Sequence, residues 1–466
     1  MKTGFFPKAF FMVSLLSAVF FMPAAFGPNI FAQERTEQQR VDINELRRDI
    51  VRFGTETEIA ALMQELREEG TDSLDNEIIA LTRHTNNHNI LAVAFNFFGE
   101  RERTGLEERA IYAVEERFDE HSETVLAAID YLGRIGATEA IPVLREVAES
   151  EERRFLTNTI RALGRIGGAA SGRVADDMAE YLVEFYEDRD LDSGPQREII
   201  LALGTNGSAA AVEFLSAIAD NSESGQFLRI ASLESLSQIG NPRGLDAVLA
   251  SVSAGEPHVR AAAVQALGPF SGSAVDAAIL DAFRDSHERT RIAAAHASRD
   301  RRLVAAVPYL RFRATRDESQ AVREHSIRAL GAIDNSESMQ VIEELFIERR
   351  NSARVRTTSG EMLMQNSPDR FLDTFIEEMD EARRRNLTAL YNSFLGILSR
   401  TTARNMEPIT RRLMAERGII ERSYALEIAA NNNLVSLADE IRVLTEDNNQ
   451  GLARRATRTL ERLGLQ

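Results

Sequence analysis

One short pattern, written AxxALG where x is any residue, recurs along the 466-residue chain at a nearly fixed interval. Its leucines are separated first by 31, 40, 33 and 31 residues, and then by 63, 33 and 35 residues. The interval of 63 holds two units, with Ser298 in the leucine position of the degraded copy. The leucines are Leu132, Leu163, Leu203, Leu236, Leu267, Leu330, Leu363 and Leu398. A repeat of about 31 to 35 residues predicts an architecture in which each unit packs on its neighbours.

Each unit is expected to form two helices. The first half, as in ATEAIPVLREVAES (137–150), has apolar residues at helical spacing and a proline near its start. A polar turn leads to an alanine-rich helix such as VRAAAVQALG (259–268), whose closing glycine is expected to be the C-cap. One register of this second helix holds small residues where two helices must approach, and apolar residues follow one position later. The small residues are Ser232, Ala263, Ala294, Ser326 and Ser359, and the apolar ones include Leu233, Val264 and Ile327.

The recurring VRxxA…ALGxIG pattern resembles HEAT repeats, in particular the short HEAT-like variety named after phycocyanobilin lyases. It is carried by AAIDYLGRIGATEAIPVL (127–144), EPHVRAAAVQALGPF (256–270) and DESQAVREHSIRALGAI (317–333). The resemblance is strongest from about residue 120 to 365 and stays in register at both ends. It implies an all-α fold, a right-handed α–α superhelix of the armadillo-like or HEAT type, with roughly 12 or 13 helical hairpins. Because no long linker interrupts the pattern, one continuous solenoid over residues 33–466 is expected.

The first residues have the layout of a secretory signal peptide. Two lysines precede an apolar run from Ala9 to Met22, and a proline and small residues follow. The run is shorter than the roughly 20 residues that span a bilayer. We expect residues 1–32 to be removed after Ala32, which predicts an exported protein, periplasmic, envelope-associated or secreted, without stable membrane insertion afterwards. An uncleaved membrane anchor is the alternative.

The composition argues against several classes of function. Acidic residues number 72 against 55 basic ones, a net charge of -17, so the surface as a whole repels nucleic acid. The chain has no cysteine, which excludes disulfides, thiolate catalysis and thiolate metal sites. No phosphate-binding loop, nucleophile elbow or zinc-protease motif is present. We therefore expect no enzymatic activity and no cofactor.

An arginine stands at the same position near the start of the second helix in successive units. The series is Arg229, Arg260, Arg291, Arg323 and Arg356, at intervals of 31, 31, 32 and 33. An acidic residue lies six positions earlier in several units, as with Glu223, Asp285 and Asp317, and again with Glu416 before Arg422. The HEAT resemblance implies that turn acids and helix-start arginines pair within and between units. We call these five arginines the arginine ladder. A track that binds anions is the alternative.

Other positions of the second helix change freely between units. The HEAT resemblance places this face on the concave side of the solenoid, where repeat proteins bind partners. Positions one and five residues after each ladder arginine share it, and we call their residues the concave stripe. They are Ile230, Glu234, Ala261, Gln265, Ile292, His296, Glu324, Arg328, Thr357 and Glu361. We expect a protein or peptide partner there, although a merely solvated face would show the same variation.

Histidines and long connections are the remaining candidates. His84 and His88 could share a metal on one helix, but Asn86 and Asn87 between them favour a turn that places them on separate helices. His296 alone in an alanine-rich helix is more typical of a surface or half-buried residue than of a catalyst. Residues 99–108 and 185–196 are expected to be long connections, and the second would account for the unit of 40 residues.

These observations predict an exported, non-catalytic scaffold or adaptor that binds a protein or peptide on its concave face. Two alternatives stay open. One is a HEAT-like enzyme of the lyase type, which the name of the repeat variety implies. The other is a purely structural component of the cell envelope.

Overall fold

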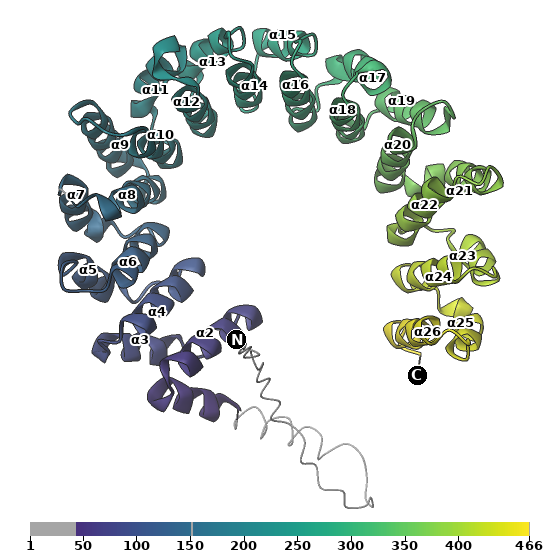
Figure 1. Cartoon of the computed structure of the whole chain (residues 1–466), viewed down its shortest axis with the longest axis horizontal. Coiled ribbons are helices and arrows are strands. Elements are labelled where there is room, and N and C mark those ends of the chain that lie inside the picture. Colours follow the sequence, from purple (N-terminus) through teal and green to yellow (C-terminus); the bar gives the residue numbers. More distant parts are fainter. Residues whose placement is uncertain (1–42, 151, 466) are drawn as a thin grey trace, which may run out of the picture. The chain divides into compact units, whose positions relative to one another are not determined.

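The computed structural model describes residues 43–150 and 152–465, and these form α-helices and short 3-10 helices without any strand (Figure 1). The predicted all-α fold is therefore confirmed. The described chain divides into two compact units, one ending at Phe97 and one starting at Phe98. The predicted signal peptide lies outside the described residues, and the single solenoid over 33–466 stays a prediction.

Unit 1 contains a helix over residues 43–53 and three further helices. These are α2 (Glu56–Glu69), α3 (Asp75–His84) and α4 (His88–Glu100), whose last residues belong to unit 2. A capping box between Thr55 and Glu58 starts α2, because each side chain satisfies a backbone N–H that the helix leaves unpaired. Ile59, Leu62 and Leu66 then follow at helical spacing and are buried.

Unit 2 consists of two rows of helices that alternate along the chain (Figure 1). The outer helices are α5 (Glu107–Glu115), α7 (Ile141–Glu149), α9 (Gly172–Glu187), α11 (Val212–Asp220), α13 (Leu245–Ser251), α15 (Ser273–Ala282), α17 (Val307–Arg316), α19 (Ser336–Ile347), α21 (Pro368–Arg384), α23 (Glu407–Met414) and α25 (Ala438–Thr445). The inner helices are α6 (Ser122–Arg134), α8 (Leu156–Ala170), α10 (Ser193–Asn206), α12 (Gln226–Ile239), α14 (Pro257–Ala266), α16 (Glu288–Asp300), α18 (Gln320–Ile333), α20 (Ala353–Asn366), α22 (Thr388–Arg400), α24 (Ile419–Asn431) and α26 (Gln450–Arg462). Short 3-10 helices lie in the connections, at Thr138–Ala140, Arg153–Phe155, Ala209–Ala211, Ser222–Ser224, Pro242–Gly244, Val304–Ala306 and Val435–Leu437.

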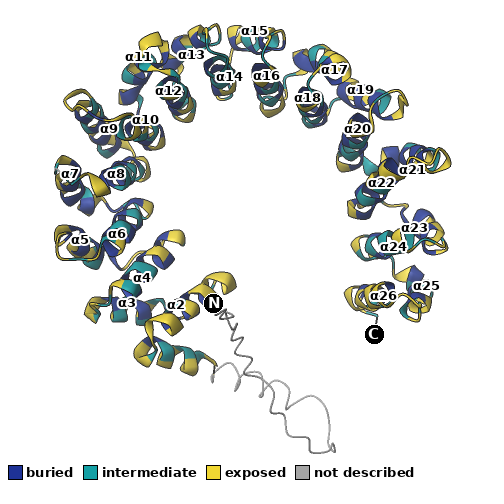
Figure 2. Cartoon of the chain, viewed as in Figure 1, coloured by how far each residue is buried: buried dark blue, intermediate teal, exposed yellow. Residues whose placement is uncertain are grey.

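The core of unit 2 lies between the two rows. Each inner helix packs on the next inner helix, and the buried residues face the neighbouring helices rather than solvent (Figure 2). All eight leucines of the repeat are at most 1% exposed, and Ser298 in the leucine position is fully buried. The five small residues of the neighbouring register are also fully buried. The residues of the repeat pattern thus form one buried stripe that continues from each repeat to the next.

The expected helix end at glycine holds for Gly268, which directly follows the C-cap Leu267 of α14, but most other glycines of the AxxALG pattern lie inside their helices. Gly133, Gly164 and Gly204 lie inside α6, α8 and α10. A Cβ on Gly133 would lie 2.7 Å from the Cα of Ala162, and one on Gly164 would lie 2.7 Å from the carbonyl oxygen of Ala202. These glycines therefore let consecutive inner helices approach closely, whereas the left-handed caps fall on other glycines such as Gly240.

The predicted long connection over 185–196 is also wrong. Helix α9 continues to Glu187 and α10 begins at Ser193, so most of the segment is helical. The unit is longer because α9 has 16 residues, against 9 in α7 and in α11. Tyr181, Phe185 and Tyr186 on this helix pack inward or against the next unit, which stabilises the added turns.

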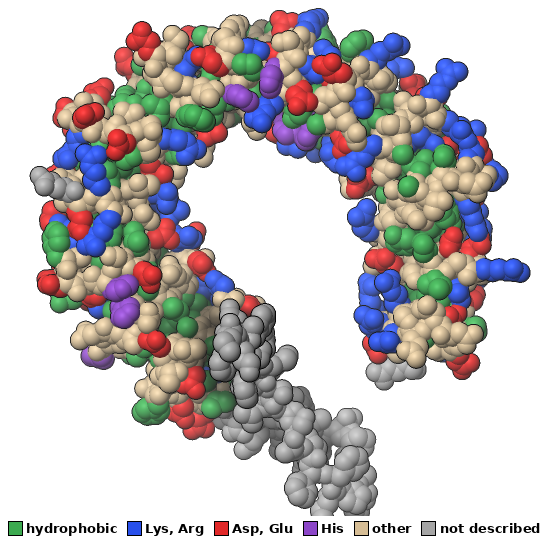
Figure 3. Space-filling view, viewed as in Figure 1, with side chains coloured by type: hydrophobic (Ala, Val, Ile, Leu, Met, Phe, Trp, Pro, Cys, Tyr) green, Lys and Arg blue, Asp and Glu red, His purple; other side chains and the backbone are tan. Residues whose placement is uncertain are grey.

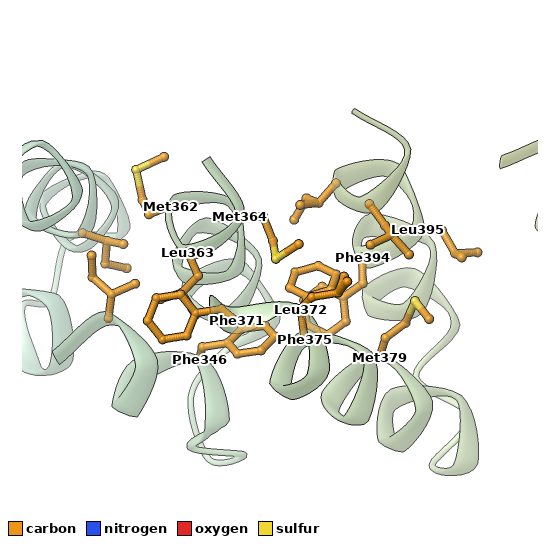
Figure 4. Packing of buried hydrophobic residues seen from close by; sticks show 14 of the residues in the cluster. Phe346, Met362, Leu363, Met364, Phe371, Leu372, Phe375, Met379, Phe394 and Leu395 are labelled. Carbon is orange, nitrogen blue, oxygen red and sulfur yellow. The ribbon is translucent and has the colours of Figure 1, made fainter. Parts of the chain in front are cut away.

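Three phenylalanines fill the interior between α19, α21 and α22 (Figure 4). Phe346, Phe375 and Phe394 are fully buried, and their ring centroids lie 5.3 to 5.4 Å apart. Gly360 on α20 stands where other units carry a larger apolar residue, directly after Ser359 of the small register. A Cβ there would lie 2.8 Å from Phe346 and 2.9 Å from Phe375. Two rings thus occupy the space that a side chain of the inner helix fills elsewhere.

Gly360→Ala is therefore expected to lower the free energy of unfolding by about 1 to 2 kcal/mol. The added methyl group overpacks the core, and this destabilises the protein by more than the higher helix propensity of alanine stabilises it. The matched control is Gly396→Ala on α22, where a Cβ would meet only the Tyr424 hydroxyl at 3.6 Å. It is expected to be neutral or to stabilise the protein by up to about 1 kcal/mol. Urea unfolding followed by circular dichroism measures both, and equal midpoints for the two variants would contradict this packing.

Candidate partner-binding face

The arginine ladder lies beneath the inner face, at the junctions between successive helical repeats. Arg291 donates from Nε and Nη2 to both carboxylate oxygens of Asp317, each at 2.8 Å. Its Nη1 donates to the carbonyl oxygens of Asp285 and Ser286, in the turn of its own unit. Both partners of this ion pair are buried. One guanidinium therefore joins its own turn to the turn of the next unit.

Other ladder arginines repeat this arrangement with some variation. Arg260 donates to both oxygens of Asp285, at 2.7 and 3.0 Å, while Arg229 and Arg356 each donate to one carboxylate, at 3.0 and 2.7 Å. Their single partners are Glu256 and Glu378. Arg323 donates to turn carbonyl oxygens, and no carboxylate among the described residues lies within ion-pair distance of it.

The structure changes the expected pairing in one respect. Asp285 and Asp317 offer their backbone carbonyls to the arginine six residues later, while their carboxylates pair with Arg260 and Arg291 of the preceding unit. Glu223 does not act in this way, since Arg229 donates to the carbonyl oxygen of Ala219 instead. Near the C-terminal end of the chain, Glu416 pairs with Arg383 of the outer helix α21, and Arg422 donates to the carbonyl oxygens of Arg417 and Gly418 and pairs with Asp447. Contacts within a unit are therefore made by carbonyl groups, and contacts between units by carboxylates.

The ladder lowers the pKa of two of its carboxylates, Asp285 and Asp317. Burial opposes ionisation of Asp317, but hydrogen bonds from Arg291 and from the backbone N–H of Ser319 hold its pKa below the usual range. Asp285 has a lowered pKa for the same reasons, with Arg260 and the N–H of His287 as donors. Since carboxylates already pair with four of the five ladder arginines, these four offer little charge to a ligand.

Part of the concave stripe lines a groove on the inner helices of unit 2. This groove has a volume of about 510 Å³ and crosses three consecutive inner helices, α12, α14 and α16. We call it the α12–α16 groove. It is lined by Gln226, Phe227, Ile230, Glu234, His258, Ala261, Ala262, Gln265, Arg289, Ile292, Ala293 and His296. Six residues of the concave stripe are among them.

The other four stripe residues lie further along the inner face. Glu324 is 9% exposed and receives two hydrogen bonds from Arg354, at 2.8 and 3.0 Å, with Arg328 at 3.7 Å. Its carboxylate is thus already bound within the chain, which leaves it little capacity for a partner. Thr357 and Glu361 line a second hollow of about 540 Å³, which crosses α20, α22 and α24.

Six residues of the α12–α16 groove were not among the sequence candidates, and three of them share one position in the repeat. Phe227, His258 and Arg289 each stand two positions before a ladder arginine. Helical spacing could have found them, because residues three and seven positions apart share a face and Phe227, Ile230 and Glu234 have this spacing. Phe227 is 70% exposed, and Arg289 lies 3.3 Å from the Nδ1 of His258.

His296 and His325 form a pair across α16 and α18. The Nε2 of His296 lies 2.8 Å from the Nδ1 of His325, and the ring centroids are 4.5 Å apart. Figure 3 shows that histidine side chains gather over this part of the inner face. Burial lowers the pKa of both rings, and the neighbouring Arg299 lowers both further, while Asp300 and Glu324 oppose the shift.

The histidine pair is expected to make the stability of unit 2 fall in mild acid. A histidine with a lowered pKa binds fewer protons when folded than when unfolded, so its contribution to stability is present above about pH 6.5 and is lost as the pH falls through the folded pKa. Thermal unfolding at pH 7.5 and 5.5 should show a larger decrease in Tm for the wild type than for the variant His296→Gln/His325→Gln. Equal decreases would contradict a neutral pair in the folded state.

The described residues contain no group of three or more His, Asp or Glu side chains that could hold a metal ion. His84 ends α3 and His88 begins α4, on separate helices as the intervening asparagines indicate. Over the same described residues, no helix has both the length and the apolar character to cross a membrane.

The fold and the repeated junctions define an α-solenoid built from HEAT-type helical hairpins. The sequence matches the model of one family, described as "Spirochaete HEAT repeat protein", over residues 51–459. This match covers most of the chain, so the protein belongs to that family of HEAT repeat proteins. The comparison with curated proteins found no match.

Several solved structures resemble the chain, at low sequence identity and with TM-scores below 0.5. Kap121p is 10% identical with a TM-score of 0.46, and the match covers 93% of this chain and 55% of Kap121p. Importin beta is 13% identical with a TM-score of 0.40, over 93% of this chain and 71% of that one. Human deoxyhypusine hydroxylase is 18% identical with a TM-score of 0.25, over 55% of this chain and 96% of that one. The chain thus spans about half the length of Kap121p.

Proposed function

We propose that this HEAT repeat protein is a non-catalytic scaffold that binds a protein or peptide on the inner face of unit 2. The observation that carries the proposal is the α12–α16 groove, where side chains that vary between units stand on a frame that stays constant. The ladder below them, with pairs such as Arg291–Asp317, sets the spacing of the helices. The inner face can therefore change its chemistry without changing the fold.

The outer helices offer a competing surface. A hollow of about 560 Å³ lies over α17 and α19 and is lined by Arg311, Glu344 and neighbouring residues. Arg311 and Glu344 pair there at 2.7 Å, so its main charged groups already bind each other. In the α12–α16 groove, Arg289 and Glu234 have no ion-pair partner within range among the described residues. Their charges are therefore available to a partner, which favours the inner face as the binding surface.

We propose further that the protein is exported and acts in the periplasm, in the envelope or outside the cell. This proposal rests on the sequence of residues 1–32, with two lysines, an apolar run and small residues before the expected cleavage after Ala32. Fractionation of cells that produce the tagged chain tests it. N-terminal sequencing of the mature protein should begin at Gln33, and an intact Met1 in a cytoplasmic fraction would contradict export.

Site-specific photo-crosslinking tests the binding proposal in the native cell. A crosslinking residue replaces Gln265, which is exposed on the inner helix α14, and in a control it replaces Asp246, which is exposed on the outer helix α13. A protein captured at position 265 and not at position 246 is the expected result. Capture at both positions alike, or at neither, would contradict a partner on the inner face and would favour a purely structural component.

A further inference from the structure

We infer that the α12–α16 groove binds an extended peptide segment in which an apolar side chain is followed or preceded by carboxylates. This inference rests on the proposed scaffold function and names the chemistry of its partner. It depends on three features of the groove: a hollow apolar floor, a cation without a carboxylate partner at one edge, and a width that suits a short extended chain.

The floor of the groove is apolar and hollow over α14. Ile230 on α12, Ala261 on α14 and Ile292 on α16 occupy the same position, one residue after their ladder arginines. Because an alanine side chain is much shorter than that of isoleucine, a space remains between the two isoleucines. Ala262 and Ala293 extend this apolar floor. An apolar side chain from a partner would fill the space and remove the floor from water.

One exposed aromatic side chain extends the apolar floor to the edge of the groove. Phe227 in the first turn of α12 is 70% exposed and lines the groove, so it adds apolar surface that a partner can remove from water. Phenylalanine is also among the residues enriched in the cores of protein interfaces. Phe227 and Ile230 together therefore provide a second apolar contact beside the hollow over α14.

The edge formed by the first helical turns attracts carboxylates. Arg289 in the first turn of α16 has His258 of α14 as its side-chain partner, at 3.3 Å, and no carboxylate within ion-pair range among the described residues. The N-termini of α12, α14 and α16 lie along this edge, and helix N-termini favour negative charge. A free guanidinium can bind a carboxylate through two parallel hydrogen bonds. The partner should therefore carry an acidic residue next to its apolar one.

The opposite edge carries groups that suit a peptide main chain. Glu234, Gln265 and His296 lie along it on α12, α14 and α16. Gln265 can both donate and accept, and Glu234 can accept from main-chain N–H groups. Glu234 also argues against a phosphate backbone, since its charge would repel one. A protein segment fits these edges better than a nucleic acid does.

The size of the groove indicates an extended segment. Three helices packed side by side span about 20 Å between the outermost axes, and an extended chain covers that distance with about six residues. The volume of about 510 Å³ lies within the range of sites that take small ligands and side chains. The groove is therefore large enough for a short segment and too small for a folded domain to enter.

The test measures binding of fluorescein-labelled peptides to the full chain by fluorescence anisotropy. The probe is a peptide on the order of eight residues, matched to the groove, with one central phenylalanine flanked by glutamates. Two control peptides replace the glutamates with lysines or the phenylalanine with serine. The variants are Arg289→Glu, Arg289→Lys and Ala261→Glu, and the control variant is Arg316→Glu, an exposed arginine on the outer helix α17.

The acidic phenylalanine peptide is expected to bind at least about tenfold more tightly than either control peptide. Arg289→Glu and Ala261→Glu should weaken it at least about tenfold, whereas Arg289→Lys should retain most binding and Arg316→Glu should leave it unchanged. Circular dichroism and Tm show whether each variant is folded. If Ala261→Glu does not fold, the comparison of Arg289→Lys with Arg289→Glu still tests the inference.

Preference for the lysine peptide, or equal binding to wild type and Arg289→Glu, would overturn the inference. So would saturable self-association in sedimentation that Ala261→Glu abolishes, because the groove would then hold a second copy of the chain. A partner crosslinked at position 265 together with failure of the acidic peptide would contradict this chemistry and leave the scaffold function standing. Failure of both experiments would contradict the scaffold function itself.

Discussion

Arg291→Ala is expected to lower the free energy of unfolding by about 3 to 5 kcal/mol. The substitution removes both hydrogen bonds to Asp317, whose side chain is completely buried, and the two bonds to turn carbonyl oxygens. Asp317 then keeps only Arg313 at 3.2 Å and the N–H of Ser319 to balance its charge. A buried charge that has lost its main partner is far more costly than a lost surface ion pair.

Arg323→Ala is the matched control for this prediction. Arg323 occupies the same position one unit later, but it donates to carbonyl oxygens and pairs with no carboxylate among the described residues. Its loss should cost about 1 to 2 kcal/mol. Urea unfolding of the full chain gives both values. If Arg323→Ala were as destabilising as Arg291→Ala, the carboxylate pairing between units would not be what stabilises the junction.

The contribution of the Arg291–Asp317 pair to stability should also depend on pH. The pKa of Asp317 is lowered in the folded protein, so its contribution is present above the unfolded pKa of about 3.9 and is lost as the pH falls through the folded value. The double variant Arg291→Met/Asp317→Leu should recover most of the stability lost in Arg291→Ala, because no charge remains buried. It should also lose this part of the acid dependence.

Phe375→Ala is expected to lower the free energy of unfolding by about 3 to 5 kcal/mol, because the substitution leaves a large cavity in the core. The ring is fully buried between Phe346 and Phe394, with centroid distances of 5.4 and 5.3 Å, and it lies against Gly360 (Figure 4). Gly360 carries no side chain that could move into the space, so the cavity should persist.

The control for this prediction is Phe312→Ala on α17, where the side chain is 55% exposed. It should cost less than about 1 kcal/mol. Hydrogen exchange gives a second measurement, because in a repeat protein the loss should be greatest in the helices next to the cavity. Equal losses for the two variants, or faster exchange spread evenly over unit 2, would contradict a local aromatic cluster.

The regular part of this fold could be predicted from the sequence because each feature repeats. The leucines, the small residues and the ladder arginines recur at one register, so the buried stripe and the start of each inner helix follow from helical geometry alone. The same register places Ile230, Ala261 and Gln265 on one face, and all three line the α12–α16 groove, while partner binding there stays a prediction. These positions depend only on which face of a helix a residue occupies.

The features that escaped prediction depend on how one helix meets another. The sequence places Asp285 six residues before Arg291, but only the packing of consecutive turns shows that its carboxylate belongs to Arg260. Likewise, the pairing of His296 with His325 and the two rings over Gly360 join residues from different helices. Spacing within one helix carries no information on these distances.

The most direct test of the inner-face account is hydrogen–deuterium exchange of the full chain with and without the partner captured at position 265. The account predicts that binding slows exchange in α12, α14 and α16, most strongly in their first turns near Phe227, His258 and Arg289. Slowed exchange confined to the outer helices α11, α13 and α15, or to α17 and α19, would contradict it.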